Sequence, residues 1–151
     1  MYERPTLSHE AASGIMQAVL GSTHHQNGAP AGVACAIVGS LGELIAFGAQ
    51  DGCGALPRKL ASRKAYTSLI LRRTTTEVKA AVDAGQIDMD RLNDPELAPM
   101  PGGAPLLVDG VIVGAIGISG LPPADDAAIA EEAAAAFNVT TTGSAASQTM
   151  Q

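Results

Sequence analysis

Residues 102–120 read GGAPLLVDGVIVGAIGISG, two apolar runs joined by Asp109 and Gly110. An Asp-Gly pair between apolar runs is typical of a β-hairpin, because a type I′ turn requires positive φ at both central positions. Gly114 and Gly117 are three residues apart, so they point to opposite faces of the second strand. Glycine weakens a strand and is found there where a bulge or a close neighbour needs the space. The stretch therefore predicts an antiparallel hairpin that something else approaches closely.

A second hairpin is predicted in the first half of the chain. Residues 33–38 and 44–47 are short apolar runs joined by the turn-forming segment Gly39-Ser40-Leu41-Gly42. The predicted order of elements is then helix, hairpin, two helices, hairpin, helix. Grouped rather than strictly alternating elements favour the α+β class, with a mainly antiparallel sheet flanked by helices. The G-x-x-G spacing within 102–120 lies inside a hairpin, so it is not a dinucleotide-binding fingerprint.

Capping signals place the helices. Thr6 or Ser8 can cap the first helix, which is predicted from its apolar stripe to end around 24–28. The second helix runs through RKLASRKAYTSLILRRTT, and Thr74 with Glu77 has the form of a capping box that starts a short third helix. Residues 86–101 contain three prolines and no clear period, which indicates an excursion over the surface. Asp125 is the expected cap of the last helix.

Composition restricts the possible functions. The 151 residues are 46% hydrophobic and 16% charged, which is typical of one domain, predicted at 1–137 and followed by a disordered tail at 138–151. With 3% aromatic residues and a net charge of −6, the chain is a poor nucleic-acid binder. No window approaches the length of a membrane span, and neither a secretory signal nor a CxxC pair is present. We therefore expect a cytoplasmic protein with reduced cysteines and no membrane partner.

The second helix carries the strongest candidate for catalytic residues. Six of the nine Lys and Arg residues fall between positions 58 and 73. Arg63 can hold a carboxylate bidentately, and Lys64 can act as an acid or a nucleophile if burial lowers its pKa. Tyr66 and Thr67 offer hydroxyl groups on the same helix. The alternative is that the charged residues are solvated or paired and that the tyrosine donates to a backbone carbonyl.

Other candidates lie at the ends of predicted elements. Gly102 and Gly103 enter the glycine-rich hairpin, where backbone without side chains lets a ligand approach closely. Asp51 and Asp125 are candidate ligand-binding or acid-base residues, although loop entry and helix capping also explain them.

Three residues are candidate ligands for iron. His24 and His25 are adjacent imidazoles at the end of the first helix, and imidazole suits haem iron. Cys53 lies in a predicted loop, where its thiolate could be exposed as a ligand or nucleophile. The alternatives are an exposed histidine pair and an inert thiol, and Cys35 in mid-strand is predicted to be a small core residue.

Several of these stretches resemble the GlcG/HbpS-like haem-binding family, whose fold is also found as the C-terminal domain of PduO-type cobalamin adenosyltransferases. The similar pieces are ASRKAYTS at 61–68, RRTT at 72–75, the run 102–120, and DDAAIAEEAAAAF at 125–137. The resemblance spans about residues 6–137. It implies a profilin-like, five-stranded antiparallel sheet, assembly into homodimers or larger oligomers, and a pocket between the second helix and the glycine-rich strand entry. Gly39 and Gln50 depart from the common VVDAGG and Met-Asp-Gly patterns.

Three functions follow as hypotheses. The resemblance implies binding of haem or a related small ligand, with haem as cofactor and with haem-linked redox, sensing or degradation activity. The second hypothesis is a cofactor-independent lyase or isomerase acting on a small organic, possibly aromatic, carboxylic acid, with Arg63 as the carboxylate anchor and Lys64, Tyr66 or a histidine moving protons. The third is an assembly or regulatory domain that binds no ligand.

Overall fold

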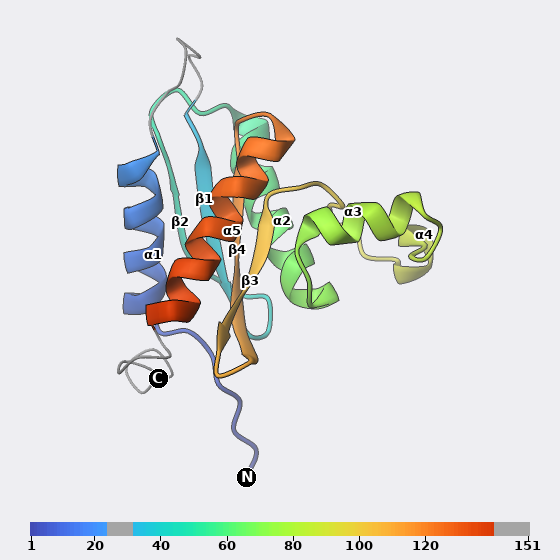
Figure 1. Ribbon diagram of the computed structural model, residues 1–151, viewed down its shortest axis with the longest axis horizontal. Helices are drawn as coiled ribbons and strands as arrows, with labels where there is room; N and C mark the ends of the chain where they lie inside the picture. Colours follow the sequence, from blue (N-terminus) through green and yellow to red (C-terminus); the bar gives the residue numbers. More distant parts are fainter. Residues whose placement is uncertain (24–31, 141–151) are drawn as a thin grey trace.

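The computed structural model describes residues 1–23 and 32–140 (Figure 1). Its elements follow the predicted order, with one extra short helix in the excursion at 86–101. They are α1 (His9–Ser22), β1 (Ala34–Gly39), β2 (Leu44–Ala49), α2 (Ala55–Leu71), α3 (Thr75–Asp83), α4 (Met89–Leu92), β3 (Gly103–Val108), β4 (Val111–Ser119) and α5 (Pro123–Thr140). Helix α5 extends to Thr140, past the predicted boundary of the tail, and 141–151 lie outside the described residues.

The four strands form one antiparallel sheet in the order β2-β1-β4-β3. The two strands of each predicted hairpin pair with each other, β1 with β2 and β3 with β4. The two hairpins are joined by pairing of β1 with β4 in the centre of the sheet. The fifth strand implied by the resemblance is not found within 1–23 and 32–140. The irregular segment that leads into β3 carries Pro95, Pro99 and Pro101, and proline cannot donate to a strand ladder.

Helices cover both faces of the sheet. Helices α1 and α5 pack on one face and α2 on the other, while α3 and α4 project beside α2 (Figure 1). The larger apolar core lies under α1 and α5, and a smaller, alanine-rich core lies under α2. The α2-side core includes Ala36, Ala61, Ala65 and Ala115, all of which are fully buried. Side chains this small bring the axis of α2 close to the sheet.

Several local predictions are confirmed. The Ser8 hydroxyl accepts the N–H of Ala11 and caps α1, and Thr74 with Glu77 forms the complete capping box of α3. Asp109 and Gly110 have φ of 50° and 78°, as a type I′ turn requires. These features depend on residues within four positions of one another, so the sequence alone determines them.

The predicted start of the last helix is wrong by three residues, because a cap at Asp125 would place the first helical residue at position 126. Helix α5 begins at Pro123, a residue whose fixed φ suits the first helical position and which has no N–H to satisfy. The carbonyl of Pro122 accepts the N–H groups of Asp125 and Asp126, so Asp125 lies inside the first turn. Its side chain is exposed there rather than capping the helix.

Glycines of the stretch 102–120 allow α2 and the sheet to touch through their backbones. A Cβ at Gly117 would overlap the carbonyl oxygen of Ala61, and one at Gly103 would overlap the carbonyl oxygen of Lys64. A Cβ at Gly114 would instead meet Leu7 on the other side of the strand. The prediction of opposite faces is confirmed, and the close neighbour of Gly117 is helix α2.

Candidate functional site

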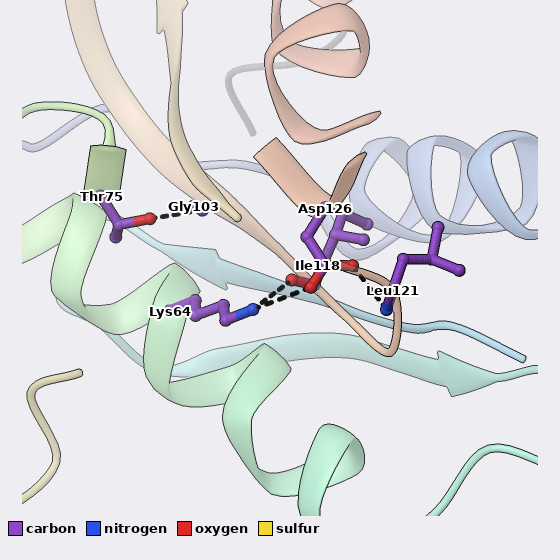
Figure 2. Close-up of polar contacts among 6 residues, drawn as sticks. All are labelled: Lys64, Thr75, Gly103, Ile118, Leu121 and Asp126. Carbon is purple, nitrogen blue, oxygen red and sulfur yellow. Dashed lines mark hydrogen bonds and ion pairs between the residues drawn. The ribbon is translucent and has the colours of Figure 1, made fainter. Parts of the chain in front are cut away.

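Lys64 lies at the centre of the interface between α2 and the sheet. The residue is 2% exposed, and its ammonium group donates to the carbonyl of Ile118 and to Oδ2 of Asp126, both at 3.1 Å (Figure 2). An ammonium group is strongly hydrated in water, so burial is tolerated only with a charged partner and further hydrogen bonds. The ion pair therefore ties α2 to the end of β4 and the start of α5.

Asp126 is the partner on α5 and is also 2% exposed. Its Oδ1 accepts the N–H of Leu121 at 3.0 Å, so each carboxylate oxygen has a partner (Figure 2). Burial raises the pKa of Asp126, and the positive charge of Lys64 and the backbone donors oppose that rise. The carboxylate closes the turn between β4 and α5 as well as neutralising Lys64.

The glycine entry of β3 lies directly against this pair. Gly102 has a φ of 129°, and a Cβ there would come within 2.9 Å of Lys64 Cδ and 3.0 Å of its Nζ. The N–H of Gly103 donates to the hydroxyl of Thr75 at 2.7 Å, and Thr75 is fully buried (Figure 2). The space beside these glycines is filled by Lys64 and Thr75, and their close packing accounts for both glycines without a ligand.

Arg63, Tyr66 and Thr67 all contact the segment 94–98. The Arg63 guanidinium donates to the carbonyls of Pro95, Glu96 and Leu97. The Tyr66 hydroxyl donates to the Asp94 carboxylate, and the Thr67 hydroxyl accepts the N–H of Ala98 at 2.8 Å. These three side chains therefore fasten the excursion at 86–101 to α2.

The Tyr66–Asp94 hydrogen bond shifts the pKa of both groups. It raises the pKa of the Tyr66 hydroxyl, with burial as a smaller contribution, because the bond favours the protonated phenol. The same bond lowers the pKa of Asp94, because it favours the carboxylate. Both shifts keep Tyr66 neutral and Asp94 charged at neutral pH.

Both cysteines have free thiols in buried positions. Cys53 is 7% exposed, unlike the exposed thiolate considered from the sequence, and its Sγ lies 3.7 Å from the carbonyl oxygen of Gly54. Burial raises the pKa of the Cys53 thiol, while Arg58 opposes the rise. Burial also raises the pKa of Cys35, to about 12. Both thiols are protonated, weak nucleophiles at neutral pH.

The remaining predicted residues are not brought into the Lys64–Asp126 cluster. Asp51 is exposed in the turn after β2, and Asp125 is exposed on the first turn of α5. His24 and His25 lie outside the described residues. The structure thus brings Lys64, Gly102 and Gly103 together beside Asp126. It brings Arg63, Tyr66 and Thr67 together against segment 94–98.

Sequence reasoning missed Asp126, Thr75 and Asp94, the partners of the predicted residues. Asp126 is 62 positions from Lys64, and no local rule separates it from its exposed neighbour Asp125. The available signal was the spacing along α5. Asp126 lies on the same helical stripe as Ile129, Ala130, Ala133 and Phe137, whose apolar spacing indicates a buried face. A carboxylate on a buried face requires a partner such as a cation.

The described residues contain no ready-made polar ligand site elsewhere. Within 1–23 and 32–140, every buried side-chain nitrogen or oxygen has a hydrogen-bond partner, and no three His, Cys, Asp or Glu side chains cluster to hold a metal ion. A shallow hollow lies at the other end of β4, bordered by Arg4, Ser40, Ile70, Arg72 and Val111. It includes none of the predicted site residues. No helix in the described part is long and apolar enough to cross a membrane.

The fold and the buried pair define an α+β protein whose four-stranded antiparallel sheet is locked to α2 through glycine contacts and one ion pair. The chain belongs to the family described as haem degrading protein HbpS-like, whose model matches residues 7–135. It is 33% identical over 119 residues to protein GlcG of Escherichia coli, covering 79% of this chain and 85% of GlcG. The predicted family is confirmed.

Solved structures show the same fold. A double mutant of Streptomyces reticuli HbpS is 25% identical with a TM-score of 0.78, covering 91% of this chain and 90% of that one. The protein ORFY of Klebsiella pneumoniae is 22% identical with a TM-score of 0.78, covering 91% and 94%. A complex of PduOC with haem is 24% identical with a TM-score of 0.76, covering 88% and 96%.

Proposed function

We propose that this protein binds haem. The observation that carries the proposal is the family match over residues 7–135, in a family described as haem degrading and HbpS-like. Redox, sensing and degradation activities all require haem to bind first, so binding is the step to test. When bound, haem supplies an iron centre for redox chemistry and a strong visible absorption band.

The described residues alone do not make a haem-iron site. Cys53 is buried with a raised pKa, and Tyr66 is held protonated by Asp94, so neither offers the anionic form that ligates iron. His9 is the one described histidine, and it is exposed on the first turn of α1 beside Ser13. The proposal therefore depends on His24 or His25, either of which would hold the haem iron through its imidazole.

Gln50 supports this assignment because it fixes the chain on both sides of the two histidines. Its side-chain amide donates to the carbonyls of Leu20 at 2.9 Å and Thr23 at 2.6 Å, and its Oε1 accepts the N–H of Val33 at 3.0 Å. One side chain thus holds the end of α1 and the entry to β1 in fixed positions. We propose that Gln50 is the positioning residue for the histidine pair.

The alternative, a lyase or isomerase acting on a carboxylic acid, receives no support from the contacts of its proposed anchor. The Arg63 guanidinium already donates to three backbone carbonyls, and the Tyr66 hydroxyl already donates to Asp94. A substrate carboxylate would have to displace these bonds and release the segment 94–98.

A haemin titration followed by visible absorbance tests the proposal. We expect a saturable, one-to-one shift of the Soret band in the wild type, lost in His24→Ala or His25→Ala. The matched controls are His9→Ala, which removes an exposed histidine, and Cys53→Ala, and both should bind as the wild type does. Slow, non-stoichiometric changes that are equal in all variants would contradict the proposal. A thermal-shift screen of small carboxylic acids against Arg63→Gln would then be the next experiment.

A further inference from the structure

The hollow at the far end of β4 has a lining that is partly apolar and partly positively charged. Its volume of about 440 Å³ is in the range of small-molecule sites, roughly 300–1,000 Å³. Four segments meet there: the chain before α1, the turn between β1 and β2, the end of α2 and the start of β4 (Figure 1). The fold therefore gathers positions from 2 to 112 around one surface.

The apolar part of the lining comes from three of these segments. Leu41 is 70% exposed, Ile70 is 44% exposed and Val111 is 49% exposed, and all three border the hollow. Single exposed apolar residues are ordinary on a protein surface, whereas several around one hollow mark a binding surface. These side chains offer a surface for the apolar body of a ligand.

The positive part of the lining consists of two exposed guanidinium groups, those of Arg4 and Arg72. Neither takes part in an ion pair within 1–23 and 32–140. Arg4 donates through Nη1 to the carbonyl of Ser40 at 3.2 Å, and its guanidinium carbon lies 5.9 Å from the centre of the Tyr2 ring. These two contacts hold Arg4 beside the hollow, and neither of them neutralises its charge.

The backbone of Arg72 makes an arginine unexpected at this position. Arg72 ends α2 with φ of 60° and ψ of 39°, a left-handed conformation in which glycine is the usual residue. The bond that closes the helix runs from the N–H of Arg72 to the carbonyl of Ser68, and a glycine would make it equally well. Non-glycine residues in such a conformation are concentrated at functional sites. The position of its side chain at the hollow gives Arg72 such a role.

The charge of the whole chain makes this positive lining unusual. The formal net charge is −6, which repels anions from most of the surface. Glu3, Glu43 and Asp109 are the acidic residues nearest to the lining segments in sequence, but no acidic side chain lines the hollow. The local charge there therefore favours an anion.

We propose that this hollow binds a small monocarboxylate with an apolar body. A guanidinium group presents parallel N–H donors that match the two oxygens of a carboxylate, so Arg4 and Arg72 would hold the charged end. The apolar body would lie against Leu41, Ile70 and Val111. This binding involves none of the residues assigned to haem and does not depend on that proposal.

Titration of the full-length, isotope-labelled protein with sodium octanoate, followed by amide NMR at neutral pH, tests the inference. We expect saturable shifts at the amides of Leu41, Ile70 and Val111. Acetate supplies the charge without the apolar body, and octan-1-ol supplies the apolar body without the charge. Inorganic phosphate supplies an anion of another shape. Each of these three probes should bind at least about tenfold more weakly than octanoate.

Arg72→Gly separates binding from folding. It should weaken octanoate binding by about tenfold or more, because a charged hydrogen-bonding partner is lost. Its melting temperature should stay at or above that of the wild type, because glycine suits the left-handed end of the helix. Arg4→Gln should also weaken binding by about tenfold. Arg73→Gln is the matched control, since this neighbouring arginine does not line the hollow, and it should bind octanoate as the wild type does.

Several results would overturn the proposal. Octanoate affinity that is unchanged in both Arg72→Gly and Arg4→Gln would show that the guanidinium groups hold no carboxylate. Octan-1-ol or phosphate binding as tightly as octanoate would remove the need for one end or the other of the ligand. Loss of the haemin Soret shift in Arg72→Gly would assign the hollow to haem instead. Shifts of the same amides on removal of 141–151, without octanoate, would identify that segment as the occupant.

Discussion

Arg63 and Lys64 are neighbours on α2, but they contact different parts of the molecule. Lys64 lies in the buried interface with the sheet, where its ammonium group donates to one carboxylate and one carbonyl. Arg63 lies at the partly exposed side, where it donates to the backbone of the excursion. Arg63 and Lys64 therefore have two separate structural roles, and these roles should differ in how much stability each contributes.

The largest effect is expected on the Lys64 side. Asp126→Ala leaves the ammonium group buried without its counter-charge, so we expect the free energy of unfolding to fall by about 3–5 kcal/mol. Asp125→Ala is the matched control, since this neighbour is exposed, and it should change stability by less than about 1 kcal/mol. Urea unfolding of both variants measures the difference. Equal losses of unfolding free energy in Asp126→Ala and Asp125→Ala would show that the buried ion pair does not hold α2 to the sheet.

The second-largest loss of stability is expected at the glycine contact between α2 and β4. Gly117→Ala forces a Cβ into the backbone of Ala61, so we expect a loss of about 1–3 kcal/mol or unfolding. Gly14→Ala in α1 has open space around its Cβ and should raise stability by up to about 1 kcal/mol through helix propensity. Thermal and urea unfolding of the pair would test this. A neutral Gly117→Ala would mean that α2 does not need this closeness.

On the Arg63 side we expect a local effect. Arg63→Gln removes the bonds to segment 94–98, so the excursion at 86–101 should become the first site of limited proteolysis. The free energy of unfolding should fall by only about 1 kcal/mol. Lys59→Gln, an exposed substitution one turn earlier on the same helix, is the control and should leave cleavage unchanged. A global loss as large as that of Asp126→Ala would remove the distinction between the two sides.

The smallest effect is the pH dependence of the Tyr66–Asp94 bond. The pKa of Asp94 is lowered in the folded protein, so the contribution of this bond is present above the unfolded pKa and is lost as pH falls through the folded one. The stability difference between wild type and Tyr66→Phe should therefore shrink in acid. NMR titration should also find the Asp94 pKa higher in Tyr66→Phe. An unchanged Asp94 pKa would contradict the assigned cause.

The sequence predicts those parts of the fold that depend on near neighbours. The turn at Asp109-Gly110, the Thr74–Glu77 capping box and the two hairpins are local, and they are confirmed. The family was also recognisable from its motifs, and the match over 7–135 confirms it. Antiparallel pairing within each hairpin then followed from the turns.

The site was harder to predict because its contacts join distant segments. Lys64 and Arg63 were identified as candidates, but the partner of Lys64 lies 62 positions away and those of Arg63 lie 32–34 positions away. A local pattern could therefore not show that Lys64 is buried in an ion pair or that Arg63 binds the backbone of segment 94–98. Gly102 and Gly103 were predicted to leave room for a ligand, and the structure fills that room with Lys64 and Thr75. A pair of glycines in the sequence is compatible both with room for a ligand and with close packing of protein side chains.

We propose that α2 and the glycine entry of β3 stabilise the fold, and that His24 or His25 holds haem. One haemin titration of three folded variants, Arg63→Gln, Tyr66→Phe and His24→Ala/His25→Ala, tests it most directly. We predict one-to-one binding with wild-type affinity in Arg63→Gln and Tyr66→Phe, and no saturable Soret shift in the double histidine variant. Loss of binding in Arg63→Gln or Tyr66→Phe, with the double histidine variant unaffected, would contradict it.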